Sequence, residues 1–222
     1  MKRIKFPAIA AFALLALAQS AASQAHYLWL EQANGQVRLY FGEYENGIRE
    51  KSGGRLDTIA VPEVQTNPAN GNRVTVAVER MDDYLAVKGA NLGPLIGQEI
   101  SMKVKDLTKS KIGIVKPMYY ARLAKNSLES ASALDLDIQP SGNNKVRVNL
   151  HGKPLAKAKL NIFAPNQWTR EYETDAAGEV VVEMPWPGLY VLQVAYVEPV
   201  KGEYQGDAYE AIRHVGTLSL LH

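Results

Sequence analysis

The chain contains no cysteine among its 222 residues. It therefore carries no disulfide, no thiolate metal site and no cysteine nucleophile, and it lacks the cysteine that anchors a lipoprotein. Long apolar runs are also scarce. The longest covers residues 6–18, is interrupted by Pro7, and is shorter than the about 20 apolar residues of a membrane span. We therefore expect no stable insertion into a membrane.

An excess of charge of one sign is absent as well. The chain has 25 Lys and Arg against 23 Asp and Glu, and three of the basic residues are Lys2, Arg3 and Lys5. Without these three the balance is 22 to 23, so no basic surface for nucleic acid is expected. No nucleophile elbow, His-Glu-x-x-His helix, P-loop or dinucleotide fingerprint occurs. With only four histidines in addition, we do not expect an enzyme.

Residues 1–25 have the three parts of a secretory signal peptide. A basic start is followed by the apolar run 6–18 and by a short stretch of small polar residues that ends at Ala25. Ser23 and Ala25 occupy the −3 and −1 positions of a cut before His26, which predicts export to the periplasm. A cut after Ser23 is the alternative, and a single uncleaved N-terminal anchor is another. Alanine at −1 favours the cut before His26.

Either cut leaves an N-terminus that is able to bind metal. As the first residue, His26 offers its α-amine and its imidazole to one ion. After the earlier cut the end is Gln24-Ala25-His26, in which the amine, two deprotonated amides and the imidazole form a square-planar site for copper or nickel.

The chain after Ala25 has mostly strand-like patterns. Residues 26–32 alternate in polarity, Asn34-Gly35 is a strong hairpin signal, and residues 36–45 alternate again. Pro117 is expected to confine its strand to a sheet edge or to break it. The further predicted strands are 73–80, 84–88, 99–105, 111–124, 145–150, 157–164, 168–174, 180–184, 189–197 and 209–221.

Short strands separated by turn residues predict an all-β fold with two β-sandwich-like Greek-key halves, of immunoglobulin or transthyretin type. The polar stretch 125–143 is the best boundary between the halves. We therefore predict an N-terminal β domain over 26–135 and a C-terminal β-sandwich over 144–222.

Glu43 and His214 are candidate partners for His26. Glu43 ends an otherwise apolar strand face, where it would either contribute to a metal site or pair with Arg49, Lys51 or Arg55. His214 shares a strand face with Ile212 and Leu218, so it is either a hydrogen-bonded core histidine or a ligand. If the last strand runs beside the N-terminus, the amine, His26 and His214 would form a T-shaped, three-nitrogen copper brace. His151, in a turn, and His222, at the C-terminus, are expected to be solvated or frayed.

Two resemblances add to this interpretation. The segments 152–158, 174–178 and 187–190 resemble a transthyretin-like or carboxypeptidase-regulatory-like sandwich. The segments 25–31, 40–43 and 213–219 resemble a bacterial periplasmic family of unknown function that is often described as the periplasmic component of cobalt/nickel transport. The second resemblance implies an exported, β-rich protein linked to transition metals.

Together these observations predict a periplasmic protein that binds a divalent transition metal (Ni, Co or Cu) through His26, His214 and Glu43. It would be a carrier or accessory of metal uptake, with the membrane component of a metal transporter as its partner. A protein-interaction or adhesion module without metal is the main alternative. A copper mono-oxygenase is a further one, which requires a second brace histidine.

Overall fold

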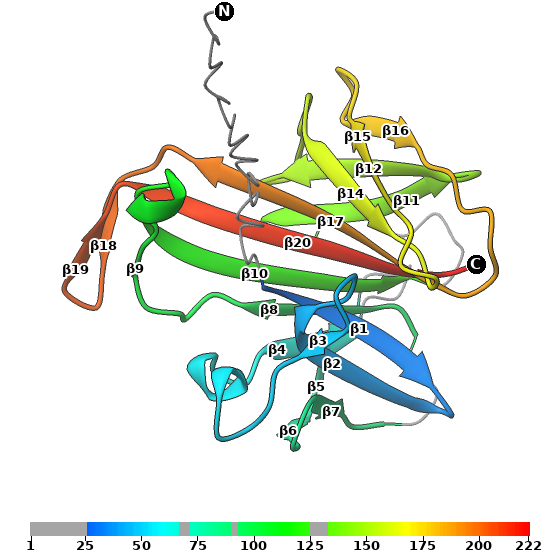
Figure 1. The fold of residues 1–222 in the computed structure, drawn as a ribbon, viewed down its shortest axis with the longest axis horizontal. Coiled ribbons are helices and arrows are strands. Elements are labelled where there is room, and N and C mark those ends of the chain that lie inside the picture. Colours follow the sequence, from blue (N-terminus) through cyan, green and yellow to red (C-terminus); the bar gives the residue numbers. More distant parts are fainter. Residues whose placement is uncertain (1–25, 67–71, 90–92, 125–132) are drawn as a thin grey trace, which may run out of the picture.

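The computed structural model describes residues 26–66, 72–89, 93–124 and 133–222. The predicted signal peptide, residues 1–25, lies outside the described residues. The described chain is built almost entirely of β-strands, with two short 3-10 helices, η1 (Arg55–Thr58) and η2 (Thr108–Ser110). The predicted all-β, sandwich-like architecture is therefore confirmed (Figure 1).

The largest sheet has nine strands and contains residues from both predicted halves. Its order is β15-β14-β17-β20-β10-β8-β4-β5, with β9 paired to the start of β10. The two longest strands, β10 and β20, pair in parallel at its centre, and the other pairs in this sheet are antiparallel. The strands are β4 (Glu63–Thr66), β5 (Thr75–Val76), β8 (Leu95–Glu99), β9 (Lys105–Asp106), β10 (Ile114–Ala124), β14 (Lys159–Phe163), β15 (Thr169–Glu173), β17 (Leu189–Glu198) and β20 (Ala211–Leu221).

A five-stranded sheet covers one face of this central sheet and begins with the predicted hairpin. The hairpin is confirmed: Asn34 and Gly35 have φ values of 52° and 73°, the two positive values that a type I′ turn needs. The turn sets the register in which Ala33 pairs with Gln36 and Tyr27 with Gly42. The strands are β1 (Tyr27–Ala33), β2 (Gln36–Glu43), β3 (Ile48–Arg49), β6 (Val78–Arg80) and β7 (Leu85–Val87).

A four-stranded sheet covers the opposite face, and a separate small hairpin projects from one end (Figure 1). The sheet consists of β11 (Leu136–Gly142), β12 (Lys145–Leu150), β13 (Lys153–Pro154) and β16 (Glu179–Val181). The small hairpin is formed by β18 (Gly202–Tyr204) and β19 (Asp207–Tyr209).

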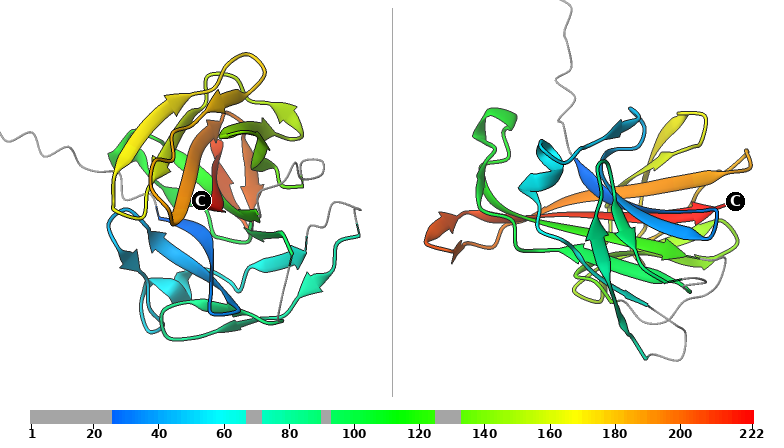
Figure 2. Two further views of the ribbon diagram at one scale, coloured as in Figure 1. Left: turned by 90° about the vertical axis from the view of Figure 1, so that its right-hand side faces the viewer. Right: turned by 90° about the horizontal axis from the view of Figure 1, so that it is seen from below.

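The alternation of side chains along β20 separates two hydrophobic cores. Val215 belongs to the core beneath β1, whereas Leu218 belongs to the core beneath β11. The Thr217 hydroxyl donates to the Leu28 carbonyl at 2.6 Å on the first side, and Gly216 lies against Leu136 on the second. Figure 2 shows the blue hairpin on one side of the red strand β20. Strand β11 contacts β20 from the other side. The faces of this one strand therefore determine which residues can meet.

The predicted boundary between the halves differs from the structure in one respect. Residues 136–142, assigned to the polar connection 125–143, form strand β11, which pairs with β12. The strand was missed because Asp137 reads as a loop residue. It is instead fully buried beneath the sheet, where Arg122 of β10 donates to both of its carboxylate oxygens at 2.8 and 2.7 Å.

Pro117 neither breaks its strand nor lies in an outer strand of the sheet, contrary to the prediction; it lies at a local gap inside the continuous strand β10. It pairs with Arg213 of the parallel neighbour β20 in the middle of the central sheet. On the other side of β10, β9 pairs only with residues 114–115 and β8 only with residues 119–123. Proline fits here because it falls in the gap between these two partners, where no ladder requires its missing N–H.

The predicted strand 99–105 is mostly a connection between β8 and β9.

Candidate functional site

His26 precedes β1 and is buried, with 7% of its surface exposed. Its Nδ1 lies 3.3 Å from Glu43 Oε1, and its Nε2 contacts a carboxylate oxygen of Glu50. An Nη1 of Arg55 approaches the same Nε2 at 3.4 Å, and Phe41 packs on the ring. Two of the three predicted ligands, His26 and Glu43, are therefore neighbours.

Glu43 is buried at the end of β2 and has one oxygen in need of a partner. Its Oε2 accepts a hydrogen bond from the side-chain amide of Asn46 at 2.8 Å. Its Oε1 accepts no hydrogen bond from the described residues, and it lies 3.3 Å from Nδ1 of His26. The expected alternative, a salt bridge with Arg49, Lys51 or Arg55, does not form among the described residues. Arg49 pairs with Glu31 at 2.8 Å, and Arg55 approaches His26. A buried carboxylate oxygen without a donor is a position that favours a cation.

His214, the third predicted ligand, lies on the other face of the central sheet. It is fully buried, alternates along β20 with Arg213 and Val215, and contacts Tyr120 and Glu198. The other two histidines are also remote from His26, because His151 packs against His214 and His222 packs against Tyr190. The T-shaped brace of His26 and His214 does not form in this fold.

Around His214 the structure assembles a cluster that the sequence did not reveal. His151 Nε2 and His214 Nε2 each lie 3.1 Å from the same oxygen, Oε2 of Glu198. One ligand atom from each of these three residues lies within 4.8 Å of the others. We call this group the His151–Glu198–His214 cluster.

Each residue of the cluster comes from a separate element. Glu198 ends β17, and the antiparallel register that places Tyr196 opposite His214 leaves Glu198 diagonal to it. His151 follows β12 in a left-handed conformation, φ 50°, and its backbone N–H donates to the Asp135 carbonyl at 2.7 Å. This turn brings the His151 ring against that of His214, with the ring centroids 5.7 Å apart and the planes almost perpendicular.

The second nitrogen of each imidazole also has a polar neighbour. Nδ1 of His214 lies 3.1 Å from the Tyr120 hydroxyl, and Nδ1 of His151 lies 3.5 Å from Oδ1 of Asp135. Groups of this kind fix the ring orientation of metal-binding histidines in proteins. Both rings are therefore held so that Nε2 points at Glu198.

The protonation equilibria of the cluster differ from one member to the next. Burial lowers the pKa of His214, although Glu198 opposes this shift. The hydrogen bond to Glu198 raises the pKa of His151, which is largely solvent-exposed. For Glu198, burial raises the pKa, but hydrogen bonds from His151 and His214 outweigh it and the pKa falls. The inner imidazole thus favours its neutral form and the carboxyl its ionised form, which are the forms that bind metal.

His151 and Glu198 could not have been identified as neighbours from their local sequence. His151 is in a turn that reads as solvated, and Glu198 is at the exposed end of a strand. The only signal was the position of Glu198 two residues after Tyr196, on the strand face that His214 also uses. Recognising it requires the pairing of β17 with β20, which lies in the tertiary structure.

Comparisons with protein-family models, curated proteins and solved structures found no match to this chain. The resemblances to a cobalt/nickel periplasmic family and to a transthyretin-like sandwich therefore stay predictions. Among the described residues, no helix is long and apolar enough to cross a membrane.

Proposed function

We propose that this chain is an exported, periplasmic protein that binds a divalent transition metal in the His151–Glu198–His214 cluster. Two imidazoles and one carboxylate form a mixed nitrogen and oxygen donor set. Such a set suits borderline ions, among them Ni²⁺, Co²⁺, Cu²⁺ and Zn²⁺. The role that follows is that of a carrier or accessory in metal uptake, which passes its ion to the membrane component of a transporter.

The observation that carries the proposal is the convergence of both Nε2 atoms on one carboxylate oxygen. Ligand atoms bound to one ion at about 2.1 Å are separated by roughly 3.0–3.4 Å in tetrahedral or octahedral geometry. The 3.1 Å separations between Glu198 Oε2 and each Nε2 fall in this range. Side-chain rotations that bring the two imidazole nitrogens closer together would exchange the shared hydrogen bonds for metal bonds.

Access to the cluster also fits a carrier. His214 is fully buried at its inner end, whereas the side chain of His151 is 46% exposed at its outer end. An ion is able to enter and leave past His151, and water completes its coordination there. A site that keeps an open position is suited to exchange rather than to permanent structural binding.

The N-terminal end supports a second binding position, which depends on removal of residues 1–25. A free α-amine on His26, its Nδ1 and Glu43 Oε1 would supply three donors. In the described part of the chain, that oxygen accepts no hydrogen bond. Arg55 lies on the Nε2 side of the ring, away from this set. This position would be created only by export and processing.

Titration of the mature, metal-free protein with Ni²⁺, Co²⁺, Cu²⁺ and Zn²⁺ tests the proposal. We expect binding tighter than about 1 μM for at least one ion. We expect Glu198→Gln and His151→Gln to weaken it by about 100-fold, while His222→Gln, the matched control, leaves it unchanged. Equal affinities in all four proteins would contradict the assignment of this cluster.

The processing step is tested separately by mass spectrometry of the exported protein. The expected mature N-terminus is His26, or Gln24 for the earlier cut. His26→Ala should then remove one metal equivalent without affecting the equivalent that depends on Glu198. An intact N-terminus after export would contradict the N-terminal position but not the His151–Glu198–His214 cluster.

A further inference from the structure

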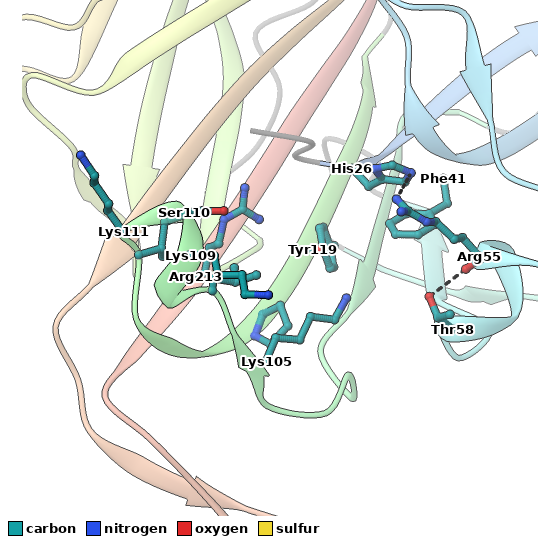
Figure 3. A pocket seen from close by; sticks show the side chains of 13 residues that line it. His26, Phe41, Arg55, Thr58, Lys105, Lys109, Ser110, Lys111, Tyr119 and Arg213 are labelled. Carbon is teal, nitrogen blue, oxygen red and sulfur yellow. Dashed lines mark hydrogen bonds between the residues drawn. The ribbon is translucent and has the colours of Figure 1, made fainter. Parts of the chain in front are cut away.

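A cavity of about 810 Å³ opens beside His26, on the face of the central sheet that packs against β1 (Figure 3). Its walls come from η1, from the segment around β9 and η2, and from the β10–β20 pair at the gap that accommodates Pro117. The volume falls in the range of small-molecule binding sites, about 300–1,000 Å³. We call this cavity the basic cleft.

Among the described residues, the charged side chains that line the basic cleft are of one sign. Five of its described lining residues are Lys or Arg, and none is Asp or Glu; the five are Arg55, Lys105, Lys109, Lys111 and Arg213. Figure 3 shows Arg55 on one side and Lys109 and Arg213 on the other, with Lys105 and Tyr119 between them. Lys111 points away from the rest. An anion in the cleft would therefore have cations on opposite sides.

These cations have no carboxylate partner in the described chain. Arg213 is 6% exposed, and its neighbour is the Tyr119 hydroxyl. Glu50 contacts His26, and Glu99 has one oxygen bound to Ser101. Glu99 and Asp106 act on Lys105 and Lys109, respectively, only through longer-range electrostatics, without a salt bridge among the described residues. Burial of an arginine without a carboxylate is costly, so the site favours a group that would supply the missing charge.

The cations also act on one another. Burial lowers the pKa of Lys105, and the positive charges of Arg213 and Arg55 lower it further, against an opposing effect of Glu99. The repulsion shows that the three side chains share one electrostatic environment. An anion placed among them would attract all three side chains and would raise the pKa of Lys105 instead of lowering it.

We propose that the basic cleft binds a small organic anion with two or more carboxylate or phosphate groups. Arginine forks pair well with either group, and charges of one sign in a low-dielectric cleft concentrate ligands of the opposite sign. Two anionic groups would span the distance between the Arg55 side and the Arg213 side. The rings of Phe41 and Tyr119 would pack against the carbon atoms between them.

The frame of the cleft is fixed before any ligand arrives. Arg80 donates to the carbonyls of Leu56 and Ile59 at 2.5 and 2.9 Å, and so holds η1, from which Arg55 projects. Arg213 is held by the parallel pairing of β20 with β10. Side chains that project from a rigid frame lose little conformational entropy when a ligand binds to them.

Isothermal titration of the mature protein tests the proposal, after metal and chelator have been removed by dialysis. The probes are citrate, pyrophosphate and inorganic phosphate. We expect citrate or pyrophosphate to bind at least about tenfold more tightly than phosphate, because each has groups for both sides of the cleft. Tighter binding of citrate identifies a carboxylate ligand, and tighter binding of pyrophosphate identifies a phosphate ligand.

Variants distinguish the cleft from nonspecific attraction. Arg55→Gln and Lys105→Gln should each raise the Kd by about tenfold, whereas Lys153→Gln on β13 should leave it unchanged. A circular-dichroism melt verifies that each variant is folded. Glu198→Gln should bind the anion normally, so failure here is distinct from failure of the proposed metal cluster. No binding of citrate or pyrophosphate up to about 10 mM, or equal binding by the cleft variants and Lys153→Gln, would overturn the proposal.

Discussion

The imidazole of His214 illustrates how single residues set the chemistry of this protein. It is fully buried, yet both ring nitrogens face polar atoms: Tyr120 on one side and Glu198 on the other. A fully buried histidine with no polar neighbours would be a poor metal ligand, because nothing would orient it. Here the ring orientation, the neutral form and the direction of Nε2 all follow from those two contacts and from burial.

Tyr120 is expected to act on the metal through His214. In Tyr120→Phe the ring of His214 loses the hydroxyl at Nδ1, so its orientation and basicity both change. We expect metal affinity to fall about tenfold in calorimetric titration. Tyr190→Phe is the matched control, since Tyr190 is another buried tyrosine of the same core and its hydroxyl binds the backbone of Trp186. Equal losses in the two variants would show that only packing is involved.

The pH dependence of metal binding is expected to depend on His151. Its pKa is raised by the hydrogen bond to Glu198, so its ring gains a proton as the pH falls while His214, with a lowered pKa, stays neutral. That proton must leave before the metal binds, so affinity should fall by about tenfold per pH unit below the pKa of His151. Titrations between about pH 5.5 and 8 measure the slope. A slope that persists in His151→Gln would contradict this role.

Elements contact one another across the layers through a few buried polar groups as well as through apolar side chains. Arg122 of β10 and Asp137 of β11 are both fully buried and connect the central sheet to the four-stranded sheet. The backbone N–H of Ala133 also donates to the Asp137 carboxylate at 2.8 Å. The pair therefore fixes the start of β11, which places Asp135 and the His151 turn near His214.

Asp137→Ala is expected to destabilise the fold strongly. It leaves the Arg122 guanidinium buried without its carboxylate, a change that costs about 3–5 kcal/mol in the free energy of unfolding. Urea denaturation measures the loss. The double variant Arg122→Met, Asp137→Leu should recover part of it, because two apolar side chains of similar volume need no counter-charge, whereas the Ala133 N–H still loses its acceptor. If the double variant is no more stable than Asp137→Ala, the pair contributes more to stability than the neutralisation of one buried charge by the other.

The same elements show how far the sequence predicts the structure. The β1–β2 hairpin was predictable because Asn34-Gly35 and the flanking alternation are local signals. Strand β11 was not, because Asp137 is tolerable in a core only beside Arg122, fifteen positions away. The same holds for the candidate site residues. The closeness of His26 and Glu43 was predictable because it follows from the hairpin. The contact between His151, Glu198 and His214 was not, because it requires three separate elements to pack together.

At the scale of the whole molecule, β10 and β20 belong to both cores. One face of each strand contributes side chains to the first core, and the other face contributes to the second. Unfolding of either half would therefore expose strands that the other half needs. The predicted halves, 26–135 and 144–222, thus share their central sheet. The two candidate binding regions lie on opposite faces of it, with the basic cleft on the side of Arg213 and the metal cluster on the side of His214.

The shared strands predict one cooperative unfolding transition. Leu30→Ala in the first core and Leu160→Ala in the second should each lower the free energy of unfolding by about 2–5 kcal/mol and shift the same transition. Calorimetry of both variants, with tryptophan fluorescence as a second probe, measures the number of unfolding transitions and the shift of each. Two separate transitions, each sensitive to one variant, would show instead that the halves unfold independently.

Anomalous diffraction from crystals of the mature protein grown with Ni²⁺ or Cu²⁺ tests the central claim most directly. The account predicts a peak about 2.1 Å from Nε2 of His151, from Nε2 of His214 and from a carboxylate oxygen of Glu198. This peak should be absent from crystals of Glu198→Gln. A peak at His26 and Glu43 in addition would mark the N-terminal position. A protein saturated with metal but without a peak at the His151–Glu198–His214 cluster would contradict the account.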